Sequence, residues 1–379
     1  MPANKKKPKH LSGRFAVFIT ILLFVCTIIF LNTKFSSGSM RRIAYWIFNG
    51  VQGDAKESSI SFDSNEFNQY TVLNGNLCVV APEKISSYKL SGKQNISLPV
   101  LLRSPAVVSS KNYYIAYDLG GLNFYVVGNN KLLFSETCDS KILNINANKS
   151  GDFSVITDGT DCKSLVTFFN TEFIPYYKFH SSDNYVADAA ISSNGKDAAI
   201  VTYGAKDGSF SSTLCLAHTN KDGFYEEIDL GDIVPFHITY LTDRKILLVS
   251  DKGTYMYDAD GKLISNMSFD NLALKSFSIG DKQVGILLDN YINGGNSKFI
   301  LINKSGEKAK ELDFDTDIFS ISCAGKYTSV QFSDKCVLLD NNGENYCEFL
   351  IPASITKCIV NKDGSVISVG ENYATLFIK

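Results

Sequence analysis

Histidine and tryptophan are scarce in this sequence of 379 residues, which contains four histidines and one tryptophan. The histidines are far apart and form no HExxH pair; they are His10, His180, His218 and His237. A zinc site of that kind is therefore not expected. No GxSxG, Walker or GxGxxG motif stands in a strand–turn–helix context. We predict no catalytic residue, no metal site and no cofactor.

Neither sign of charge is in clear excess, because the formal net charge is only −2. A protein with no global basic field has no long-range attraction for the phosphates of a nucleic acid. Nucleic acid is therefore excluded as a predicted partner. Proline is rare, with 8 residues against 27 glycines, a ratio that suits strands separated by tight turns.

Long apolar runs are missing except for one near the N-terminus, FAVFITILLFVCTIIFL at residues 15–31. As a helix this run would span about 26 Å, close to the ~30 Å hydrocarbon core of a membrane. A cleaved secretory signal is the alternative, but its apolar region is usually shorter and ends in an A-x-A-like site. We therefore predict an uncleaved transmembrane helix over residues 15–32.

The first fourteen residues contain basic side chains and no acidic one, so residues 1–14 form a basic tail. Because basic flanks stay on the inner side, we expect a single-pass protein of the cell membrane. Its N-terminus would be cytoplasmic, and everything after residue 32 would be extracytoplasmic.

A juxtamembrane segment over residues 33–56 includes the stretch MRRIAYWIFNGV, residues 40–51. It contains the one tryptophan of the chain, and two interpretations are open. The stretch is either a short amphipathic helix leading into the folded domain or a segment lying in the headgroup region. The membrane-interface candidates are Arg41, Arg42, Tyr45 and Trp46.

From residue 57 onward, a tight turn between two apolar runs recurs eight times, at spacings of 36 to 48 residues. The turns are VLNGNL, SSKNYY, NKSGDF, SSNGKD, LTDRKI, SIGDKQ, CAGKYT and NKDGSV. Short runs rich in Val, Ile, Leu, Tyr and Phe follow each turn, as expected of strands. A period of about 40 residues is typical of the four-stranded blades of a β-propeller.

The blade count depends on the two ends of this region. Seven candidate fourth strands follow eight candidate third strands, so one blade lacks its outer strand. The missing strand is expected at SSISFD, residues 58–63, paired with the C-terminal YATLFIK, residues 373–379. Such pairing closes a ring and leaves no exposed sheet edge. We predict an all-β, eight-bladed β-propeller over residues 57–379.

On this repeat period and strand pattern, residues 57–379 resemble the β-propeller class of WD-repeat and quinoprotein-like proteins. They are also similar to membrane-anchored Firmicutes propellers of unknown function. The WD dipeptide and its Gly-His partner are absent, and Trp46 lies outside the repeats. The blade-docking tryptophans of quinone-dependent dehydrogenases are therefore missing, and this departure argues against a quinone cofactor.

Eight cysteines follow the predicted anchor, and no CxxC spacing suggests zinc. Four of them lie in apolar strands, where a free cysteine behaves as a small hydrophobic residue. These are Cys78, Cys215, Cys336 and Cys358. We expect a mostly reduced, buried set; if any pair forms, the candidates are Cys323, Cys336 and Cys347 of one blade.

An aspartate recurs where one blade hands over to the next, and these connections must share one face of a propeller. The residues are Asp63, Asp139, Asp183, Asp232, Asp270 and Asp315. Either they are there because aspartate suits turns, or they form an acidic face around the channel mouth. Such a face would bind a cationic or polyhydroxylated partner, directly or through a divalent ion.

Three functions stay open. The first is a membrane-anchored interaction scaffold or sensor for an envelope protein or wall polymer. The second is a carbohydrate-active or other propeller enzyme, which would need two loop carboxyls roughly 5–9.5 Å apart. The third is a receptor for a small ligand near the lipid, with a deep apolar pocket.

Overall fold

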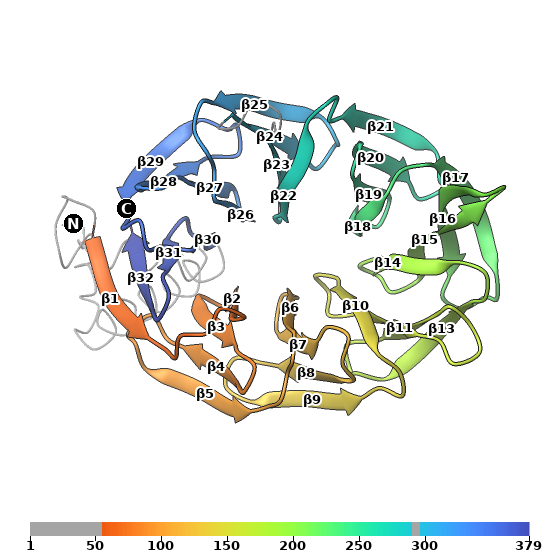
Figure 1. Ribbon diagram of the computed structural model, residues 1–379, viewed down its shortest axis with the longest axis horizontal. Coiled ribbons are helices and arrows are strands. Elements are labelled where there is room, and N and C mark those ends of the chain that lie inside the picture. Colours follow the sequence, from red (N-terminus) through yellow and green to blue (C-terminus); the bar gives the residue numbers. More distant parts are fainter. Residues whose placement is uncertain (1–54, 290–295, 379) are drawn as a thin grey trace, which may run out of the picture. The chain divides into compact units, whose positions relative to one another are not determined.

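The structure, a computed structural model, describes residues 55–289 and 296–378. The predicted transmembrane helix 15–32 lies outside these residues, as do Arg41, Arg42, Tyr45 and Trp46. Within the described part, no helix is long and apolar enough to cross a membrane. Eight four-stranded sheets form a ring around a central axis, and the region enclosed by the inner strands is here called the channel (Figure 1).

Each sheet is a blade of four antiparallel strands, ordered from the channel to the rim. Blade 1 consists of β2 (Gln69–Leu73), β3 (Asn76–Val80), β4 (Lys84–Tyr88) and β5 (Gln94–Pro99). Blade 2 consists of β6 (Pro105–Ser109), β7 (Tyr114–Asp118), β8 (Asn123–Val127) and β9 (Leu132–Thr137). Blade 3 consists of β10 (Ile142–Ala147), β11 (Phe153–Asp158), β12 (Ser164–Phe169) and β13 (Pro175–Ser181). Blade 4 consists of β14 (Tyr185–Ile191), β15 (Asp197–Lys206), β16 (Ser209–His218) and β17 (Phe224–Gly231).

The second half of the ring repeats this pattern. Blade 5 consists of β18 (Pro235–Thr242), β19 (Lys245–Ser250), β20 (Gly253–Asp258) and β21 (Leu263–Ser268). Blade 6 consists of β22 (Ala273–Ile279), β23 (Gln283–Asp289), β24 (Ser297–Asn303) and β25 (Lys308–Phe314). Blade 7 consists of β26 (Ser320–Ala324), β27 (Tyr327–Gln331), β28 (Lys335–Leu339) and β29 (Asn345–Leu350). Blade 8 consists of β30 (Lys357–Val360), β31 (Val366–Val369), β32 (Tyr373–Ile378) and β1 (Ala55–Ser61).

The pairing of β1 with β32 confirms the predicted closure of the ring by the N-terminal strand. Ala55 lies opposite Ile378 and Ser61 lies opposite Tyr373, in antiparallel register. The strand begins at Ala55 and therefore starts earlier than the predicted 58–63. Beyond its end, the Phe62 N–H still donates a hydrogen bond to the Asn372 carbonyl, at 3.0 Å.

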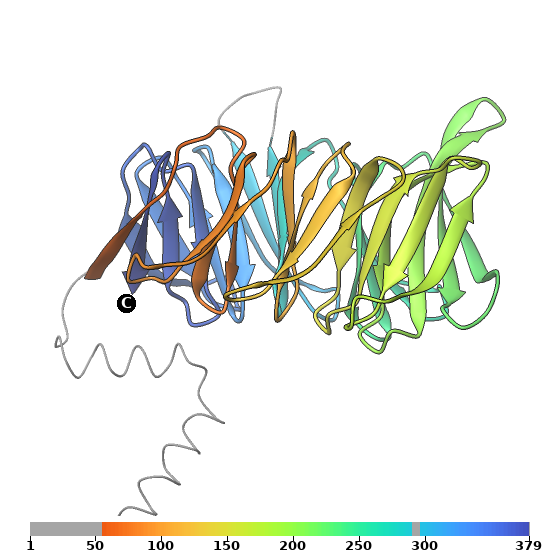
Figure 2. The same cartoon turned by 90° about the horizontal axis from the view of Figure 1, so that it is seen from below.

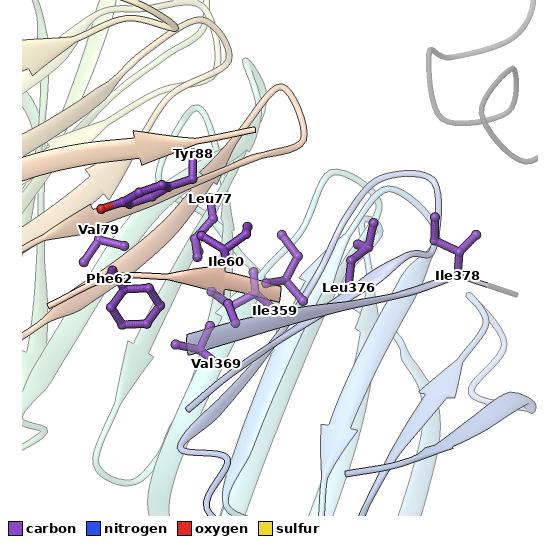
Figure 3. Close-up of a cluster of buried hydrophobic side chains, with 11 residues drawn as sticks. Ile60, Phe62, Leu77, Val79, Tyr88, Ile359, Val369, Leu376 and Ile378 are labelled. Atoms are coloured by element: carbon purple, nitrogen blue, oxygen red, sulfur yellow. The ribbon is translucent and has the colours of Figure 1, made fainter. Parts of the chain in front are cut away.

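The core consists of eight clusters of buried apolar side chains, one between each pair of neighbouring blades. At the closure, Ile60 and Phe62 of the N-terminal segment pack with Leu77 and Val79 of blade 1 and Leu376 of blade 8 (Figure 3). Successive side chains of a strand point to opposite sides, so the intervening serines are exposed. The first segment therefore contributes packing as well as backbone pairing.

Antiparallel order places the connections on two faces. One face, here the junction face, carries the segments from each fourth strand to the next blade and the turns between second and third strands. The other, the hairpin face, carries the turns between first and second and between third and fourth strands. Ala55 and Ile378 lie opposite each other at the hairpin face, and β1 runs from there to the junction face (Figure 2).

The hairpin of β15 and β16 is the longest among the described residues, with ten residues in each strand. The β15–β16 pair continues to Lys206 and Ser209 and projects beyond the junction face (Figure 2). Its two-residue turn consists of Asp207 and Gly208, which have φ values of 51° and 79°. Two residues with positive φ give the turn whose twist matches that of paired strands.

Candidate functional site: the two faces and the channel

All six predicted aspartates lie on the junction face, and all six are exposed. Each follows the end of an outer strand by one or two residues: Asp63 follows β1, Asp139 β9, Asp183 β13, Asp232 β17, Asp270 β21 and Asp315 β25. The six aspartates therefore lie toward the outer part of the face. They do not form the expected ring around the channel mouth, because each connection between blades reaches the channel only at the following inner strand.

Two of the six aspartates form ion pairs. Asp63 lies 2.5 Å from the Lys84 ammonium, and Asp232 lies 2.6 Å from that of Lys252. The other four form no ion pair within the described residues and are here called the unpaired aspartates. They are Asp139, Asp183, Asp270 and Asp315. Asp270 has a φ of 52°, and its N–H donates to the Ser268 hydroxyl at 2.9 Å, so this aspartate has a role in the turn itself.

The rest of the junction face has the same sign of charge. Its described connections contain fourteen acidic and four basic residues. Besides the six aspartates, the acidic ones are Glu66, Glu83, Asp161, Asp207, Asp251, Asp317, Asp334 and Glu371. The basic ones are Arg103, Lys141, Lys163 and Lys252. A cationic partner would therefore meet a favourable potential over the whole face.

Two clefts between blades open next to unpaired aspartates. The first, of about 330 Å³, lies between blades 2 and 3 and is lined by Asp139, Glu136 and Lys178, among others. The second, of about 830 Å³, lies between blades 6 and 7 and is lined by Asp315 and by the exposed Phe319. Both clefts combine carboxylates with apolar walls, which suits side chains with a cationic end and an apolar stem.

Inside the channel wall, Asp188 of β14 is buried, with 1% of its surface exposed. Its carboxylate accepts hydrogen bonds from Asn144 and Asn146 of blade 3, at 3.0 and 3.1 Å. It also accepts from the backbone N–H groups of Ala189 and Ile238, at 2.8 and 2.9 Å. A buried charge costs much less when donors satisfy it, and these donors come from three neighbouring blades.

His237 of β18 completes this network. Its Nδ1 lies 2.8 Å from the second carboxylate oxygen of Asp188, and its ring stacks on Phe277 of blade 6, with centroids 5.5 Å apart. A carboxylate accepts only, so Nδ1 of His237 carries a proton and donates it in a hydrogen bond to Asp188. The side chain of His237 is 23% exposed. The arrangement orients one imidazole in the channel wall.

At the hairpin face, a three-residue bridge crosses the channel mouth. The Asp281 carboxylate, in blade 6, lies 3.2 Å from the Lys149 ammonium of blade 3 and 2.9 Å from the Lys362 ammonium of blade 8. Burial lowers the pKa of Lys149, and the nearby carboxylate offsets part of that effect. For Asp281, burial acts to raise the pKa, but the bonds to both lysines outweigh it and the pKa is lowered.

Seven of the eight turns between first and second strands carry an exposed basic residue, and together these form what we call the basic ring. Its members are Lys111, Lys149, Lys196, Arg244, Lys282, Lys326 and Lys362. The acidic residues of the same turns are buried or half-buried; they are Asp152, Asp243, Asp281 and Asp363. The exposed charge of the inner hairpin face is therefore positive. Turns between third and fourth strands, farther from the channel, contain equal numbers of acidic and basic residues.

The structure confirms the predicted burial of the four strand cysteines. Cys78, Cys215, Cys336 and Cys358 are buried, as predicted. The thiol of Cys336 forms a hydrogen-bonded contact with Cys358 of the next blade, and this contact raises its pKa. All eight cysteines of the described residues are free thiols, so the candidates Cys323, Cys336 and Cys347 form no disulfide there.

The sequence did not predict the pairing of Asp188 with His237, and it indicated no site at any of the four histidines. A signal was present: Asp188 stands in the middle of the apolar strand VADAAI, where an ionised side chain needs several donors. Within the described part of the chain, no three His, Cys, Asp or Glu side chains are grouped so as to hold a metal ion.

A model of a protein family matches residues 51–375. The chain belongs to DUF5711, a family of unknown function. No curated protein sequence matches the chain. The family therefore agrees with the boundaries of the propeller and leaves the activity open.

Solved structures with a similar fold are propellers. The C-terminal WD40 domain of Sif2 gives a TM-score of 0.60 at 11% identity, covering 87% of this chain and 99% of that one. Chaetomium thermophilum Sqt1, bound to the N-terminus of the ribosomal protein L10, gives 0.58 at 10% identity, with 86% and 100% covered. The quinohemoprotein alcohol dehydrogenase ADHIIG from Pseudomonas putida HK5 gives 0.54 at 10% identity, with 86% and 75% covered. At these identities the similarity shows the fold alone.

Proposed function

We propose that this protein is a membrane-anchored, extracytoplasmic interaction scaffold or sensor whose junction face binds a cationic envelope protein or wall polymer. The observation that carries the proposal is the charge of that face: its described connections contain fourteen acidic and four basic residues. The closed ring holds these carboxylates on rigid strand ends, which lowers the entropy cost of presenting them to a partner.

The fold supports this role without specifying it. A propeller offers a broad loop face on a rigid frame, and functions are determined by the groups on that face. Chaetomium thermophilum Sqt1, which shares the fold, is bound to the N-terminus of a ribosomal protein. A segment of another protein is thus one kind of partner that a propeller can hold.

Membrane anchorage is tested by fractionation and by protease access. The run at 15–31 and the basic tail before it support a helix with a cytoplasmic N-terminus. Protease added to intact cells stripped of their wall should digest the propeller and leave residues 1–14 protected. Recovery of the protein in the soluble fraction, or protection of the propeller, would contradict the assignment.

The acidic face is tested by changing the four unpaired aspartates to asparagine, as D139N, D183N, D270N and D315N together. Asparagine keeps the size of the side chain and much of its turn-forming hydrogen bonding. We expect the variant to fold normally and to lose the partner crosslinked to the wild type in native membranes. Wild-type capture should also weaken as salt rises.

A matched control changes acidic residues of the hairpin face that lie outside the basic ring, as E172Q and D222N. This variant should retain the partner. If the junction-face variant is stable and captures everything that the wild type captures, the acidic-face function is wrong.

An enzyme remains the second candidate, and one observation favours it. The Asp188 carboxylate orients the His237 imidazole through its Nδ1, an arrangement that also occurs in general-base sites. His237→Gln separates the two functions. A scaffold should keep its partner and its effect in cells, whereas an enzyme using this base should lose its effect while the partner stays bound.

A further inference from the structure

We propose that the hairpin face docks on anionic phospholipid headgroups, so that the junction face points away from the membrane. This inference rests on the membrane anchor of the proposed function. It adds a second binding surface, an orientation of the propeller, and the chemical class of the lipid.

The first support is the distribution of exposed charge on the hairpin face. All seven members of the basic ring are exposed, whereas the acidic side chains of the same turns are buried or half-buried. Asp363 accepts hydrogen bonds from the N–H and hydroxyl groups of Ser365, at 2.9 and 2.7 Å. Asp281 is shared by Lys149 and Lys362, so this bridge retains an excess positive charge. A flat anionic surface would meet lysines and one arginine without a competing exposed carboxylate from these turns.

The second support is the place where the chain enters the propeller. Ala55 lies at the hairpin face, opposite Ile378. An interfacial segment is one of the two interpretations of residues 40–51 given by the sequence, and the four steps from residue 51 to residue 55 span at most about 14 Å when fully extended. If that segment lies at headgroup level, the hairpin face is the face that the chain holds within contact distance of the lipid.

The third support is the opposite charge of the two faces. An anionic membrane attracts basic residues within about one Debye length, ~8 Å at physiological salt, and repels carboxylates over the same distance. The reversed orientation would bring the acidic junction face to the lipid and would require the chain to pass around the rim. Both effects favour the same orientation, which leaves the junction face free for the partner.

The test uses the full chain reconstituted in vesicles, with a benzophenone amino acid at one of two exposed positions. Asn112 lies in a turn of the hairpin face and Ser182 in a connection of the junction face. In phosphatidylcholine vesicles containing phosphatidylglycerol, irradiation should give at least a fivefold higher yield of lipid adduct from position 112 than from position 182. In phosphatidylcholine alone, the yield at position 112 should fall severalfold.

A charge-reversal variant connects this result to the basic ring. K111E, K196E and K282E together should lower the adduct at position 112 to the level seen in phosphatidylcholine alone. The matched control reverses three basic residues of the junction face, as R103E, K141E and K163E, and should leave the adduct unchanged. Thermal melting of both variants checks that the propeller is folded.

Flotation of the vesicles separates the anchor from the orientation. If the wild type fails to float, the anchor of the proposed function is wrong, and this inference falls with it. If the protein floats but positions 112 and 182 give equal adducts, the inference alone is overturned. The same conclusion follows if position 112 crosslinks a second copy of the chain or an added anionic polymer in place of lipid.

Discussion

The Lys149 ammonium of blade 3 lies 3.2 Å from the Asp281 carboxylate of blade 6, across the mouth of the channel. Lys149 also donates a hydrogen bond to the Gly280 carbonyl, at 2.8 Å. Gly325 of blade 7 packs against the backbone of Lys362. Its φ is 59°, and a Cβ at this position would lie 2.7 Å from the Lys362 carbonyl oxygen. Ion pairs thus join turns of blades 3, 6 and 8 at one end of the channel, and the turn of blade 7 packs closely against that of blade 8.

Asp281→Asn should lower the free energy of unfolding by about 0.5–1 kcal/mol at pH 7, a size typical of partly exposed ion pairs. Since the folded pKa of Asp281 is below the ordinary value of 3.8, its contribution is present above that pH and is lost as the pH falls through the folded pKa. Thermal melts at pH 7 and between pH 4 and pH 2 should show the gap to wild type closing. Lys282→Gln, an adjacent exposed change, should leave stability within about 0.5 kcal/mol.

Asp188→Asn should destabilise the propeller by about 3 kcal/mol or more, because the new amide would direct donors at groups that are themselves donors. His237→Gln, at the edge of the network, should cost about 1 kcal/mol or less. Urea unfolding followed by circular dichroism gives the free energy of unfolding of both variants. A loss below about 0.5 kcal/mol for D188N would mean that the carboxylate is not needed to hold blades 3, 4 and 5 together.

Ile60→Ala should cost about 2–4 kcal/mol, because the side chain is 1% exposed within the cluster that seals blade 8 to blade 1. Ser59→Ala, one residue earlier and exposed, is the matched control and should change stability by less than about 0.5 kcal/mol. A variant lacking residues 55–64 should aggregate through the uncovered edge of β32. If that variant melted at the wild-type temperature, the closure would not contribute to stability.

Among the cysteines of the propeller, Cys162 should react first with a maleimide at pH 8. Cys138 shares its cleft and is also only half-buried. Burial, together with the charges of Glu136 and Asp139, raises the pKa of the Cys138 thiol to about 12, so little thiolate is present. Peptide mapping by mass spectrometry gives the order of labelling, and Glu136→Gln should speed the reaction of Cys138. Labelling of the buried Cys78 before Cys162 would contradict the order.

The strands and the closure of the ring could be predicted because both depend on short-range patterns. Alternation in a strand places Ile60 and Phe62 on one side, and a turn such as Asn74–Gly75, with φ values of 51° and 78°, marks each hairpin. The absence of one outer strand then left the N-terminal segment as the remaining candidate. Alternation and turns are local signals, whereas the closure followed from counting strands over the whole repeat region.

The channel contacts could not be predicted in the same way. Asp188 and His237 belong to different blades, and Lys149 and Asp281 lie on blades 3 and 6. Which side chains meet across a ring depends on its diameter and on the register of each inner strand, and neither quantity is encoded in a local pattern. The position of the aspartates also depended on where each outer strand ends, to within one or two residues.

β1 is the first strand of the propeller to be synthesised, and its partner β32 is the last. Synthesis proceeds at about 5–20 residues per second, so β1 is complete some 15 to 60 s before β32 follows it. Throughout that interval β1 has no partner within its own chain, while blades 1 to 7 can form in order behind it. Two nascent chains held close together could exchange these first strands, each closing the ring of the other. A shorter interval before residues 373–378 are made would leave less time for such an exchange.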